Sequence, residues 1–385
     1  MDKLLLRSAC IDDLKKRAKK RIPTFVFDYI EEGCNANTAV ANNRTALNNV
    51  HLRPDYLAPH TAPNLSTHVL GQSYNAPVGV APLGLTGLVW PNASAMHARA
   101  AHAANIPFVL STVSTLSIED AAVHAKENFW FQLYPPSDAA IGADLLRRVE
   151  QSGCKNLVVT LDVPTPSRRI RAIKSGLSVP PKITPTSVFQ SMIRPKWSMA
   201  TVAHGLPQFA NLTPYMDSST MAMSDAAQFM RTRMRAVVDA QTLAQIRQMW
   251  PHNLIVKGIS HVADATQAIE LGADAIIVSN HGGRQLDAAQ PSALCLKAIA
   301  DELGHKTTIM ADSGVESGVD VARYLALGAQ MVFTGRAMLY GVAAHGEDGA
   351  AHALDLILDE LEQIMSQLHC ATPYELSKHL ITPKI

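Results

Sequence analysis

The sequence predicts an α/β protein, a (β/α)8 TIM barrel with an N-terminal helical extension and a long insertion after the fourth strand. Short apolar, β-rich runs recur eight times along the 385 residues. Each run is followed by a polar or Gly/Pro break and then by a helix-like stretch. Continuous apolar strands that alternate with helices are typical of a covered parallel sheet, and eight such units are the number that closes a barrel.

The eight predicted strands fall into two groups of four. The first four are APVGVAP (76–82), IPFVLST (106–112), FWFQLY (129–134) and NLVVTLD (156–162). The last four are NLIVKG (253–258), AIIVSN (275–280), TTIMADS (307–313) and MVFTGR (331–336). Two of the helix-like segments between them end at Gly272 and Gly328, where glycine suits a left-handed C-cap. A doubly wound open sheet is the alternative fold, but no Gly-x-Gly-x-x-Gly follows the first strand.

Two segments flank or interrupt these units within what we expect to be one domain, residues 1–385. Residues 1–70 precede the first strand and are expected to form a helical cap that closes the base of the barrel. Residues 163–252 are too long for a single crossover, and a helix-like segment (224–250) lies near their end. Loops of that length inside a compact domain are usually functional or disordered.

Composition limits the classes of partner and compartment. Lys plus Arg number 34 against 33 Asp plus Glu, a net charge of +1, so nucleic acid is not an expected partner. The five cysteines are scattered without a Cys-x-x-Cys pair, which indicates reduced thiols in a cytosolic setting and no zinc or other metal site. The N-terminus has no apolar signal-peptide core, and no run of 18 apolar residues occurs, so neither secretion nor a membrane span is expected.

The residues at the strand ends indicate a functional site, because chemistry in such barrels takes place where the strands end and the βα loops converge. Every predicted strand ends in groups able to bind or react. They are Pro82-Leu83-Gly84, Ser111-Thr112, Gln132 with Tyr134, Thr160 with Asp162, Lys257, His281 with Arg284, Asp312, and Gly335-Arg336. A single histidine after a strand is more often structural, and an aspartate there is often a helix N-cap. The complete set indicates a site.

The segment SNHGGRQLD (279–287), together with Lys257 and Asp162, strongly resembles the FMN-dependent α-hydroxy-acid oxidase and dehydrogenase family. The resemblance extends from RIPTFVFDYIEEG to TGRAMLYGVAAHGE, nearly the whole chain. Within the family, VAPLGLTG, IPFVLSTVS, FWFQLY and TLDVPTPSRR are most similar to the respiratory L-lactate and mandelate dehydrogenases. RPKWSMATVAHGLPQFANLTPY in the insertion matches more loosely.

The resemblance implies a role for each matching residue. His281 would be the base that removes a substrate proton, hydrogen-bonded to Asp162, and Lys257 would lie beside the flavin N1–C2 edge. The substrate would be bound by Tyr29, Tyr134, Arg169 and Arg284, the two guanidinium groups holding its carboxylate. FMN would be bound by Pro82, Leu83, Gly84, Ser111, Gln132, Thr160, Lys257 and Ser279, and its phosphate by Asp312, Ser313, Gly314, Gly335 and Arg336.

The implied reaction is the FMN-dependent oxidation of an (S)-2-hydroxy acid, similar to L-lactate, to a 2-oxo acid. The chain has no haem, iron–sulfur or nicotinamide motif, so electrons are expected to pass to a quinone or another external acceptor. Gly84 favours a dehydrogenase, because many oxidases have alanine there. The alternatives are a soluble oxidase that makes H₂O₂ from O₂, a catalytically silent flavin-binding protein, and a related flavin barrel with non-redox or nucleotide chemistry.

The insertion has features expected of a peripheral membrane segment. It carries Met192, Ile193, Trp197, Met199, Leu206 and Phe209 among the basic residues Lys182, Arg194 and Lys196. Such a mixture predicts contact with a membrane interface. A substrate lid or packing in an oligomer is the alternative. The expected protein is a cytoplasmic homotetramer, with the cytoplasmic face of the inner membrane as its place of attachment, and the basic run Lys15–Arg21 is expected to be a solvated helix face.

One residue departs from the family pattern. After Asp312-Ser313-Gly314-Val315 most members have an arginine that contacts the flavin phosphate, whereas this chain has Glu316. Either Glu316 is a solvated residue in the first turn of a helix, or it faces the phosphate and alters FMN binding.

Overall fold

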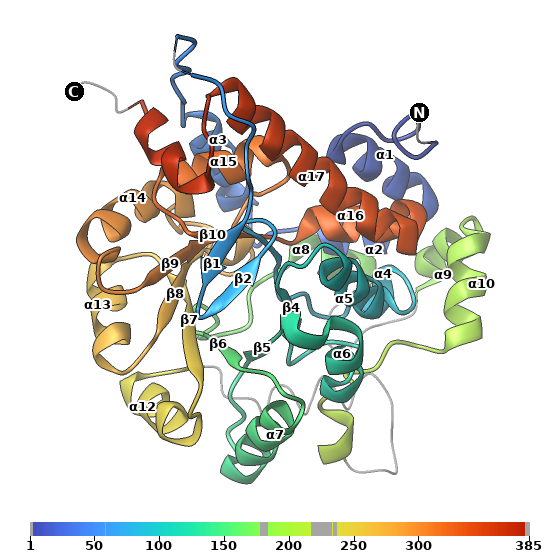
Figure 1. The fold of residues 1–385 in the computed structure, drawn as a ribbon. Helices are drawn as coiled ribbons and strands as arrows, with labels where there is room; N and C mark the ends of the chain where they lie inside the picture. Colours follow the sequence, from blue (N-terminus) through green and yellow to red (C-terminus); the bar gives the residue numbers. More distant parts are fainter. Residues whose placement is uncertain (1–2, 58, 178–183, 217–232, 234–236, 382–385) are drawn as a thin grey trace.

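The computed structural model describes residues 3–57, 59–177, 184–216, 233 and 237–381 (Figure 1). Eight parallel strands close into a barrel in the order β10-β3-β4-β5-β6-β7-β8-β9. Their bounds are Val78–Val80 (β3), Phe108–Ser111 (β4), Phe129–Leu133 (β5), Asn156–Thr160 (β6), Asn253–Ile259 (β7), Ala275–Val278 (β8), Thr308–Ala311 (β9) and Met331–Thr334 (β10). The predicted (β/α)8 barrel is confirmed. Only β7 runs beyond its predicted segment, by one residue, after a register shift at Lys257.

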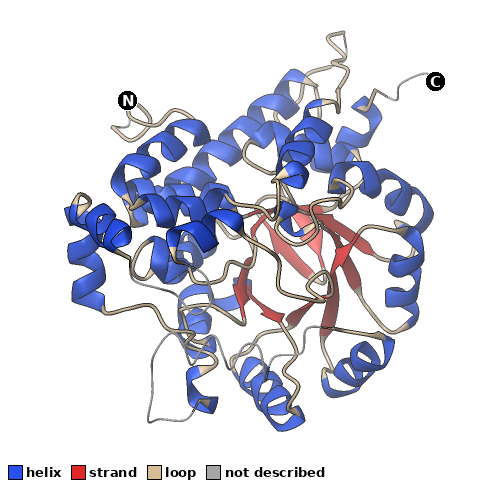
Figure 2. Cartoon of the chain, turned by 180° about the vertical axis from the view of Figure 1, so that it is seen from behind, coloured by secondary structure: helices blue, strands red, loops and turns tan. Residues whose placement is uncertain are grey.

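Helices surround the barrel on its outer face (Figure 2). They are α4 (Thr86–Val89), α5 (Ala93–Ala103), α6 (Ile118–Ala125), α7 (Ala139–Gln151), α12 (Ala240–Met249), α13 (Val262–Glu270), α14 (Ser292–Leu303), α15 (Gly318–Ala326), α16 (Arg336–His345) and α17 (Glu347–Gln367). Side-chain caps fix several of their starts, because the first backbone N–H groups of a helix lack partners within it. Asp138 accepts from the N–H of Ala140 in α7, and Ser317 accepts from the N–H of Asp320 in α15.

Apolar side chains fill the interior of the barrel, as in other barrels of this type. One cluster of contacts joins Val109, Trp130, Val158, Ile255, Ile277, Met310, Met331 and Phe333, all of them buried. The rings of Trp130 and Phe333 are 5.7 Å apart, in the range of favourable aromatic pairs. The barrel is therefore a packed core below the ends of its strands.

A two-stranded hairpin closes the amino end of the barrel. Its strands β1 (Thr67–Val69) and β2 (Gln72–Tyr74) meet at a Leu70-Gly71 turn, where both residues have positive φ, as in the turns that two-residue hairpins favour. Trp130 donates an Nε1–H bond of 3.0 Å to the Tyr74 hydroxyl, and the Asn253 amide donates to the Leu70 carbonyl at 3.3 Å. The prediction that the N-terminal helices close the base was wrong, because this hairpin takes that place.

The N-terminal helices α1 (Ile11–Arg21), α2 (Thr24–Glu31) and α3 (Thr38–Asn48) do form, but they lie toward the opposite, carboxyl end of the strands. The amphipathic α1 buries Ile11, Leu14 and Ala18 and packs against α16. Helix α3 packs against the 3₁₀ turn η3 (His281–Gly283), which follows β8. These helices therefore cover the side of the barrel where chemistry is expected.

The insertion contributes α8 (Ile170–Ser175), α9 (Pro185–Met192), α10 (Pro195–His204) and the 3₁₀ turn η2 (Thr213–Tyr215). Helices α9 and α10 project from the side of the molecule (Figure 1), each with proline at its first position, where proline is favoured. Trp197 anchors the pair: it is buried and donates to the Leu88 carbonyl at 3.1 Å. Of the helix expected over 224–250, α12 gives the last part, while 224–232 and 234–236 lie outside the described residues. Among the helices of the described ranges, none has the length and apolar character needed to traverse a bilayer.

Candidate active site

A cavity of about 650 Å³ lies at the carboxyl ends of the strands. This volume is within the usual range of small-molecule sites. Most of the residues that the sequence predicted for the site line it, namely Tyr29, Pro82, Leu83, Gly84, Ser111, Tyr134, Thr160, Arg169, Lys257, His281, Arg284, Asp312, Ser313, Gly314, Gly335 and Arg336. The barrel brings these residues together from all eight strand ends and from α2.

Three other predicted residues lie behind this lining and hold it in place. Asp162 binds the ring of His281. The side-chain oxygen of Gln132 accepts from the Ser111 hydroxyl at 2.9 Å. Ser279 is buried, and its hydroxyl oxygen accepts from Lys257 Nζ at 2.7 Å and from the backbone N–H of His281 at 3.0 Å. Ser279 therefore positions two residues of the cavity.

The imidazole of His281 is oriented by a carboxylate. Its Nδ1 lies 2.9 Å from Asp162 Oδ1, and both side chains are largely buried. Burial favours the neutral acid, but His281 and Lys257 outweigh it and hold the pKa of Asp162 below its usual value. Asp162 is thus an ionised acceptor for the Nδ1–H group, which leaves Nε2 as the ring nitrogen able to take a proton.

The loop that carries His281 has a backbone that two glycines make possible. His281, Gly282 and Gly283 have φ of +57°, +65° and +75° in succession, a left-handed conformation that glycine adopts at least cost. A Cβ on Gly283 would lie 2.6 Å from the backbone nitrogen of Val40 in α3. The Asn280 side chain accepts from the Gly283 N–H at 3.2 Å. The turn therefore packs directly against the N-terminal helices.

Lys257 is a buried cation at the end of β7. Its Nζ lies 2.9 Å from Asp312 Oδ2, at the end of β9. Burial alone would lower the pKa of Lys257, but Asp312 and Asp162 outweigh it and raise the pKa. The lysine is therefore charged and held in one position. A group that stabilises negative charge on a ligand needs both properties.

Three guanidinium groups face the cavity, those of Arg169, Arg284 and Arg336. Arg284 Nη1 donates to the carbonyls of Tyr29, Ile30 and Glu32, at 3.1, 3.2 and 2.6 Å. These carbonyls end α2, where a helix attracts cations. Burial, Arg169 and Arg336 lower the pKa of Arg284, because like charges disfavour the protonated form. Such a cluster is a site for an anion.

Two tyrosines complete this part of the cavity. The Tyr29 hydroxyl donates to the Gly84 carbonyl at 2.9 Å, which joins α2 to the end of β3. Burial, aided by the Asp162 charge, raises the pKa of Tyr134, so its hydroxyl keeps its proton. Tyr134 can therefore donate its proton to a bound ligand, whereas Tyr29, whose single proton goes to the Gly84 carbonyl, can offer a ligand its oxygen as an acceptor.

Gln132 Nε2 and Thr160 Oγ1 are among the buried polar atoms that lack hydrogen-bond partners within the described residues, and both belong to the ends of strands. Thr160 pairs in register with Lys257 across β6 and β7. Because buried polar groups are nearly always paired, these atoms indicate a polar ligand above the barrel. The heteroatom-rich ring system of FMN fits this donor set, and Arg336 with the glycine turns at Gly314 and Gly335 offers a place for its phosphate.

Glu316 lines the cavity too, and Arg336 is one of the cations whose charge acts on it. Helix α15 begins at Gly318, capped by Ser317, so Glu316 precedes the helix. Burial raises the pKa of Glu316, although Lys15, Arg44 and Arg336 oppose the shift. The interpretation of Glu316 as a solvated residue in the first turn of a helix was therefore wrong.

Several cavity residues were not predicted from the sequence. Val163, Thr165, Leu177, Phe209 and Val238 contribute from the loop after β6 and from the insertion. Val163, Thr165 and Phe209 lie in segments that match the family, but a match does not give the direction of a side chain, which depends on the path of the loops. Phe209 was expected at a membrane surface, but it lines the cavity.

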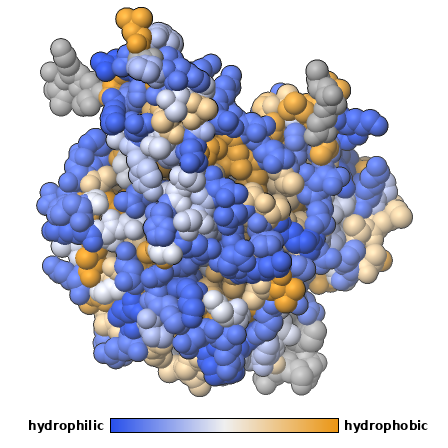
Figure 3. Space-filling view, viewed as in Figure 1, coloured by the Kyte–Doolittle hydropathy of each residue, from blue (hydrophilic) through white to orange (hydrophobic). Residues whose placement is uncertain are grey.

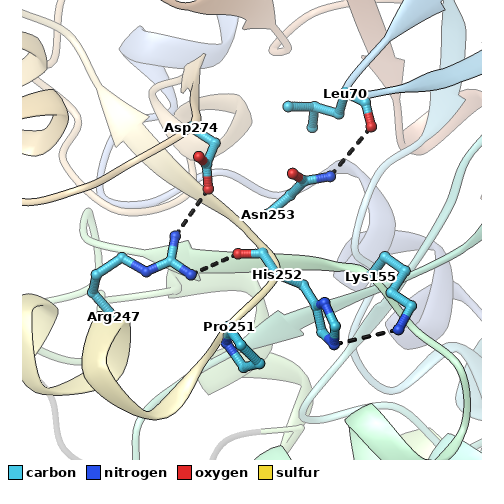
Figure 4. Close-up of a pocket in the computed structure, with 7 residues that line it drawn as sticks. All are labelled: Leu70, Lys155, Arg247, Pro251, His252, Asn253 and Asp274. Carbon is cyan, nitrogen blue, oxygen red and sulfur yellow. Dashed lines mark hydrogen bonds and ion pairs between the residues drawn. The ribbon is translucent and has the colours of Figure 1, made fainter.

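A second cavity, of about 450 Å³, lies at the amino ends of the strands (Figure 4). Arg247 donates from Nη1 to Asp274 Oδ2 at 2.9 Å and from Nη2 to the backbone carbonyl of His252 at 2.7 Å. Asn253 ties this region to the hairpin. Residues at this face of a barrel serve stability, and these contacts agree with that role.

Comparison with known proteins agrees with this geometry. The model of the FMN-dependent dehydrogenase family matches residues 18–383. An L-lactate dehydrogenase of Azorhizobium caulinodans is 38% identical over 357 residues, which cover 92% of this chain and 93% of that protein. An (S)-mandelate dehydrogenase of Pseudomonas putida is 36% identical over 363 residues, covering 94% and 90%.

Solved structures give the same result. The crystal structure of the monotopic membrane protein (S)-mandelate dehydrogenase matches with a TM-score of 0.92 and 35% identity, covering 97% of this chain and 99% of that one. A structure of mandelate oxidase matches with a TM-score of 0.82 and 29% identity, covering 98% and 99%.

Proposed function

Because this chain belongs to the FMN-dependent dehydrogenase family, whose members include α-hydroxy-acid dehydrogenases, we propose that it oxidises an (S)-2-hydroxy acid similar to L-lactate. The product is the 2-oxo acid, and the electrons pass to a quinone or another external acceptor. One observation carries the proposal. The His281–Asp162 pair faces the same cavity as the guanidinium groups of Arg169 and Arg284. A base and an anion site side by side suit a substrate with a hydroxyl group next to a carboxylate.

Arg169 and Arg284 bind the substrate carboxylate in this proposal. The three carbonyl bonds of Arg284 all come from Nη1, so its Nε and Nη2 groups remain to meet a carboxylate as a planar fork. Arg169 lies at the start of α8 and lines the same cavity. Tyr29 and Tyr134 hydrogen-bond the substrate oxygens.

His281 takes a proton from the bound substrate at Nε2. The imidazolium that results is stabilised by Asp162, which the barrel keeps ionised and 2.9 Å away at Nδ1. FMN, when bound, accepts the two electrons that leave the substrate. Gln132, Thr160 and Lys257 would hold its ring system, and Arg336 with the turns at Gly314 and Gly335 would hold its phosphate.

The apolar outer face of α9 and α10 supports a peripheral position on a membrane. Val188, Phe189, Met192, Met199, Val202 and Leu206 are exposed on this projecting pair, which forms one edge of the surface in Figure 3. Trp197 and Phe209, which were expected there too, turn inward. Arg194 donates to the carbonyl of Ile22 at 3.2 Å, so the basic helix α1 lies next to this face. Exposed apolar residues beside basic ones suit anionic lipid.

We propose that this face attaches the protein to the cytoplasmic side of the inner membrane, where a quinone is the acceptor. The likeness to a monotopic mandelate dehydrogenase supports it. That the protein is a homotetramer stays a prediction. Analytical sedimentation in mild detergent measures the oligomeric state. The second candidate is a soluble oxidase that reduces O₂ to H₂O₂, which the likeness to mandelate oxidase favours. A catalytically silent flavin protein is disfavoured, because His281, Asp162 and Lys257 are all in place.

The visible spectrum tests the reaction. The purified protein should be yellow, and an (S)-2-hydroxy acid should bleach it under anaerobic conditions. A series of lactate, glycolate, mandelate and longer-chain acids identifies the substrate class. A protein that stays yellow with every acid overturns the proposed reaction. Turnover with a quinone analogue, compared with turnover in oxygen, then decides between dehydrogenase and oxidase.

A further inference from the structure

The phosphate end of the cavity carries a carboxylate where a dianion would have to bind. Glu316 lines the cavity together with Gly314, Gly335 and Arg336, the residues best placed to hold a phosphate. Its backbone N–H donates to Asp320 Oδ2 at 3.0 Å, which fixes the chain just before α15. The side chain therefore belongs to the cavity and not to the helix surface.

Charged and titratable groups approach this end from every helix packed around it. They are Lys15 of α1, Glu31 of α2, Arg44 of α3, Asp320 and Arg323 of α15, Arg336 and Tyr340 of α16, and Glu360 of α17. Most of them are already engaged. Lys15 Nζ lies 2.6 Å from Glu31 Oε2, Arg44 Nη1 lies 2.6 Å from Asp320 Oδ2, and Glu360 accepts from the Gly318 N–H at 2.7 Å.

Of the three cations whose charge acts on Glu316, namely Lys15, Arg44 and Arg336, these pairs leave Arg336 as the one without a carboxylate partner among the described residues. Its Nε and Nη2 donate to the carbonyls of Ile30 and Gly282, both at 3.0 Å. While Glu316 is ionised, its charge cancels that of Arg336. A phosphate dianion would then enter a half-buried site without net positive charge, which is unfavourable.

We propose that this chain binds FMN together with a proton, which is carried by the carboxyl group of Glu316. Protonation removes the opposing charge and leaves Arg336 free to attract the phosphate. It also gives Glu316 an O–H group that donates to a phosphate oxygen, in place of a repulsive carboxylate. The proposal rests on FMN as the cofactor, but not on which substrate is oxidised or which acceptor is used.

The sign of the pH effect follows from linkage. Burial already raises the pKa of Glu316 in the free protein, and a bound dianion raises it further. FMN therefore binds most tightly at low pH, where Glu316 is protonated before binding. As pH rises above the pKa that Glu316 has in the FMN-free protein, the affinity for FMN falls by up to about tenfold per pH unit. The phosphate itself stays mainly a dianion from pH 6.5 to 8.5, because its second pKa is about 6.

Dilution of the holoprotein tests the proposal. FMN released from a flavoprotein is measured by its fluorescence, which gives a dissociation constant at each pH from 6.5 to 8.5. We expect a dissociation constant for the parent that rises with pH, and one for Glu316→Gln that stays nearly constant. Glu302→Gln, which changes an exposed carboxylate on α14, is the matched control and should follow the parent.

Riboflavin separates the phosphate from the ring. It lacks the phosphate, so its affinity for the full-length apoprotein should not depend on Glu316 or follow the pH trend. A parent dissociation constant for FMN that is flat across this range overturns the proposal. So does an equal slope in Glu316→Gln, which would place the titrating group elsewhere. Neither measurement contains a hydroxy acid, so failure here is distinct from failure to bleach with substrate.

Discussion

Asp162 and His281 follow strands that are not neighbours, and a glycine on the strand between them lets the two side chains meet. Asp162 follows β6, His281 follows β8, and Gly258 lies on β7 with φ of +97°. A Cβ on Gly258 would lie 2.7 Å from both Cβ and Cγ of Asp162. The carboxylate therefore reaches the imidazole across a space that only glycine leaves open.

The base itself is tested by His281→Gln. Glutamine keeps a polar side chain but accepts no proton, so flavin reduction by the substrate should slow by about 10²–10⁴-fold, the usual contribution of a positioned acid–base group. FMN content should stay near that of the parent. Stopped-flow reduction under anaerobic conditions measures the rate. A near-normal rate would show that another group is the base.

The glycine on β7 gives a second test, one in which neither catalytic residue is itself substituted. Gly258→Ala should push Asp162 away from His281, and the rate of flavin reduction should fall while both side chains remain. The matched control is Gly71→Ala in the base hairpin, where φ is +80° and no atom lies within 4 Å of the added Cβ. The control carries only the backbone strain, about 1–2 kcal/mol. Equal reduction rates in both variants would refute the packing argument.

The carboxylate clamp is tested by Arg284→Lys. Lysine keeps the charge but loses the planar fork, so the dissociation constant of a 2-oxo acid product should rise while FMN content does not change. The same substitution at Arg169 is the comparison, because Arg169 donates to no backbone carbonyl within the described part of the chain. If only Arg284→Lys also lowers the melting temperature, its carbonyl bonds to α2 stabilise the fold. Unchanged product affinity in Arg284→Lys would remove it from the clamp.

Glu316→Arg tests whether the phosphate lies beside this residue. An arginine there would add a charge-assisted hydrogen bond, so FMN should bind more tightly by about 1–3 kcal/mol. Equilibrium titration of apoprotein with FMN measures the gain, and the same titration with riboflavin should show none. If FMN affinity is unchanged, the phosphate is bound elsewhere.

Membrane attachment is tested on the outer face of α9 and α10. Phe189, Met192, Met199 and Val202 are 61%, 71%, 71% and 82% exposed, and their joint replacement by serine should move the protein from the membrane fraction to the supernatant. Substrate should still bleach the flavin, because these four residues do not line the cavity. Val123→Ser on α6, 70% exposed, is the control and should not change sedimentation. A parent protein that never sediments with membranes favours the soluble oxidase.

The barrel and most of its site could be predicted because buried parallel strands are continuous apolar runs. Once eight strands are placed, barrel geometry fixes where they end, so Lys257, His281 and Asp312 had to share one face. The base hairpin escaped prediction because THVLGQSY has strands of only three residues, with polar side chains among them. Nothing local distinguishes such a short hairpin from a loop.

Other features depend on contacts between distant segments. Gly258 is required by the side chain of Asp162, nearly a hundred residues earlier, and no sequence pattern records this. Phe209 belongs to a segment whose composition is that of a surface loop, yet the path of the insertion directs its side chain into the cavity. The direction of the Glu316 side chain likewise depends on the residue at which α15 begins.

The filled barrel and its hairpin plug determine how molecules travel to and from the flavin. The described side chains along the barrel axis leave no passage toward the amino end. In the proposed reaction, substrate, product and electron acceptor therefore all reach the flavin from the carboxyl end of the barrel, where α2 and the loop after β6 contribute to the cavity lining. The two half-reactions must then take turns, with the oxo acid departing before the acceptor approaches. Because substrate and acceptor compete for the same approach, an excess of substrate would delay reoxidation of the flavin.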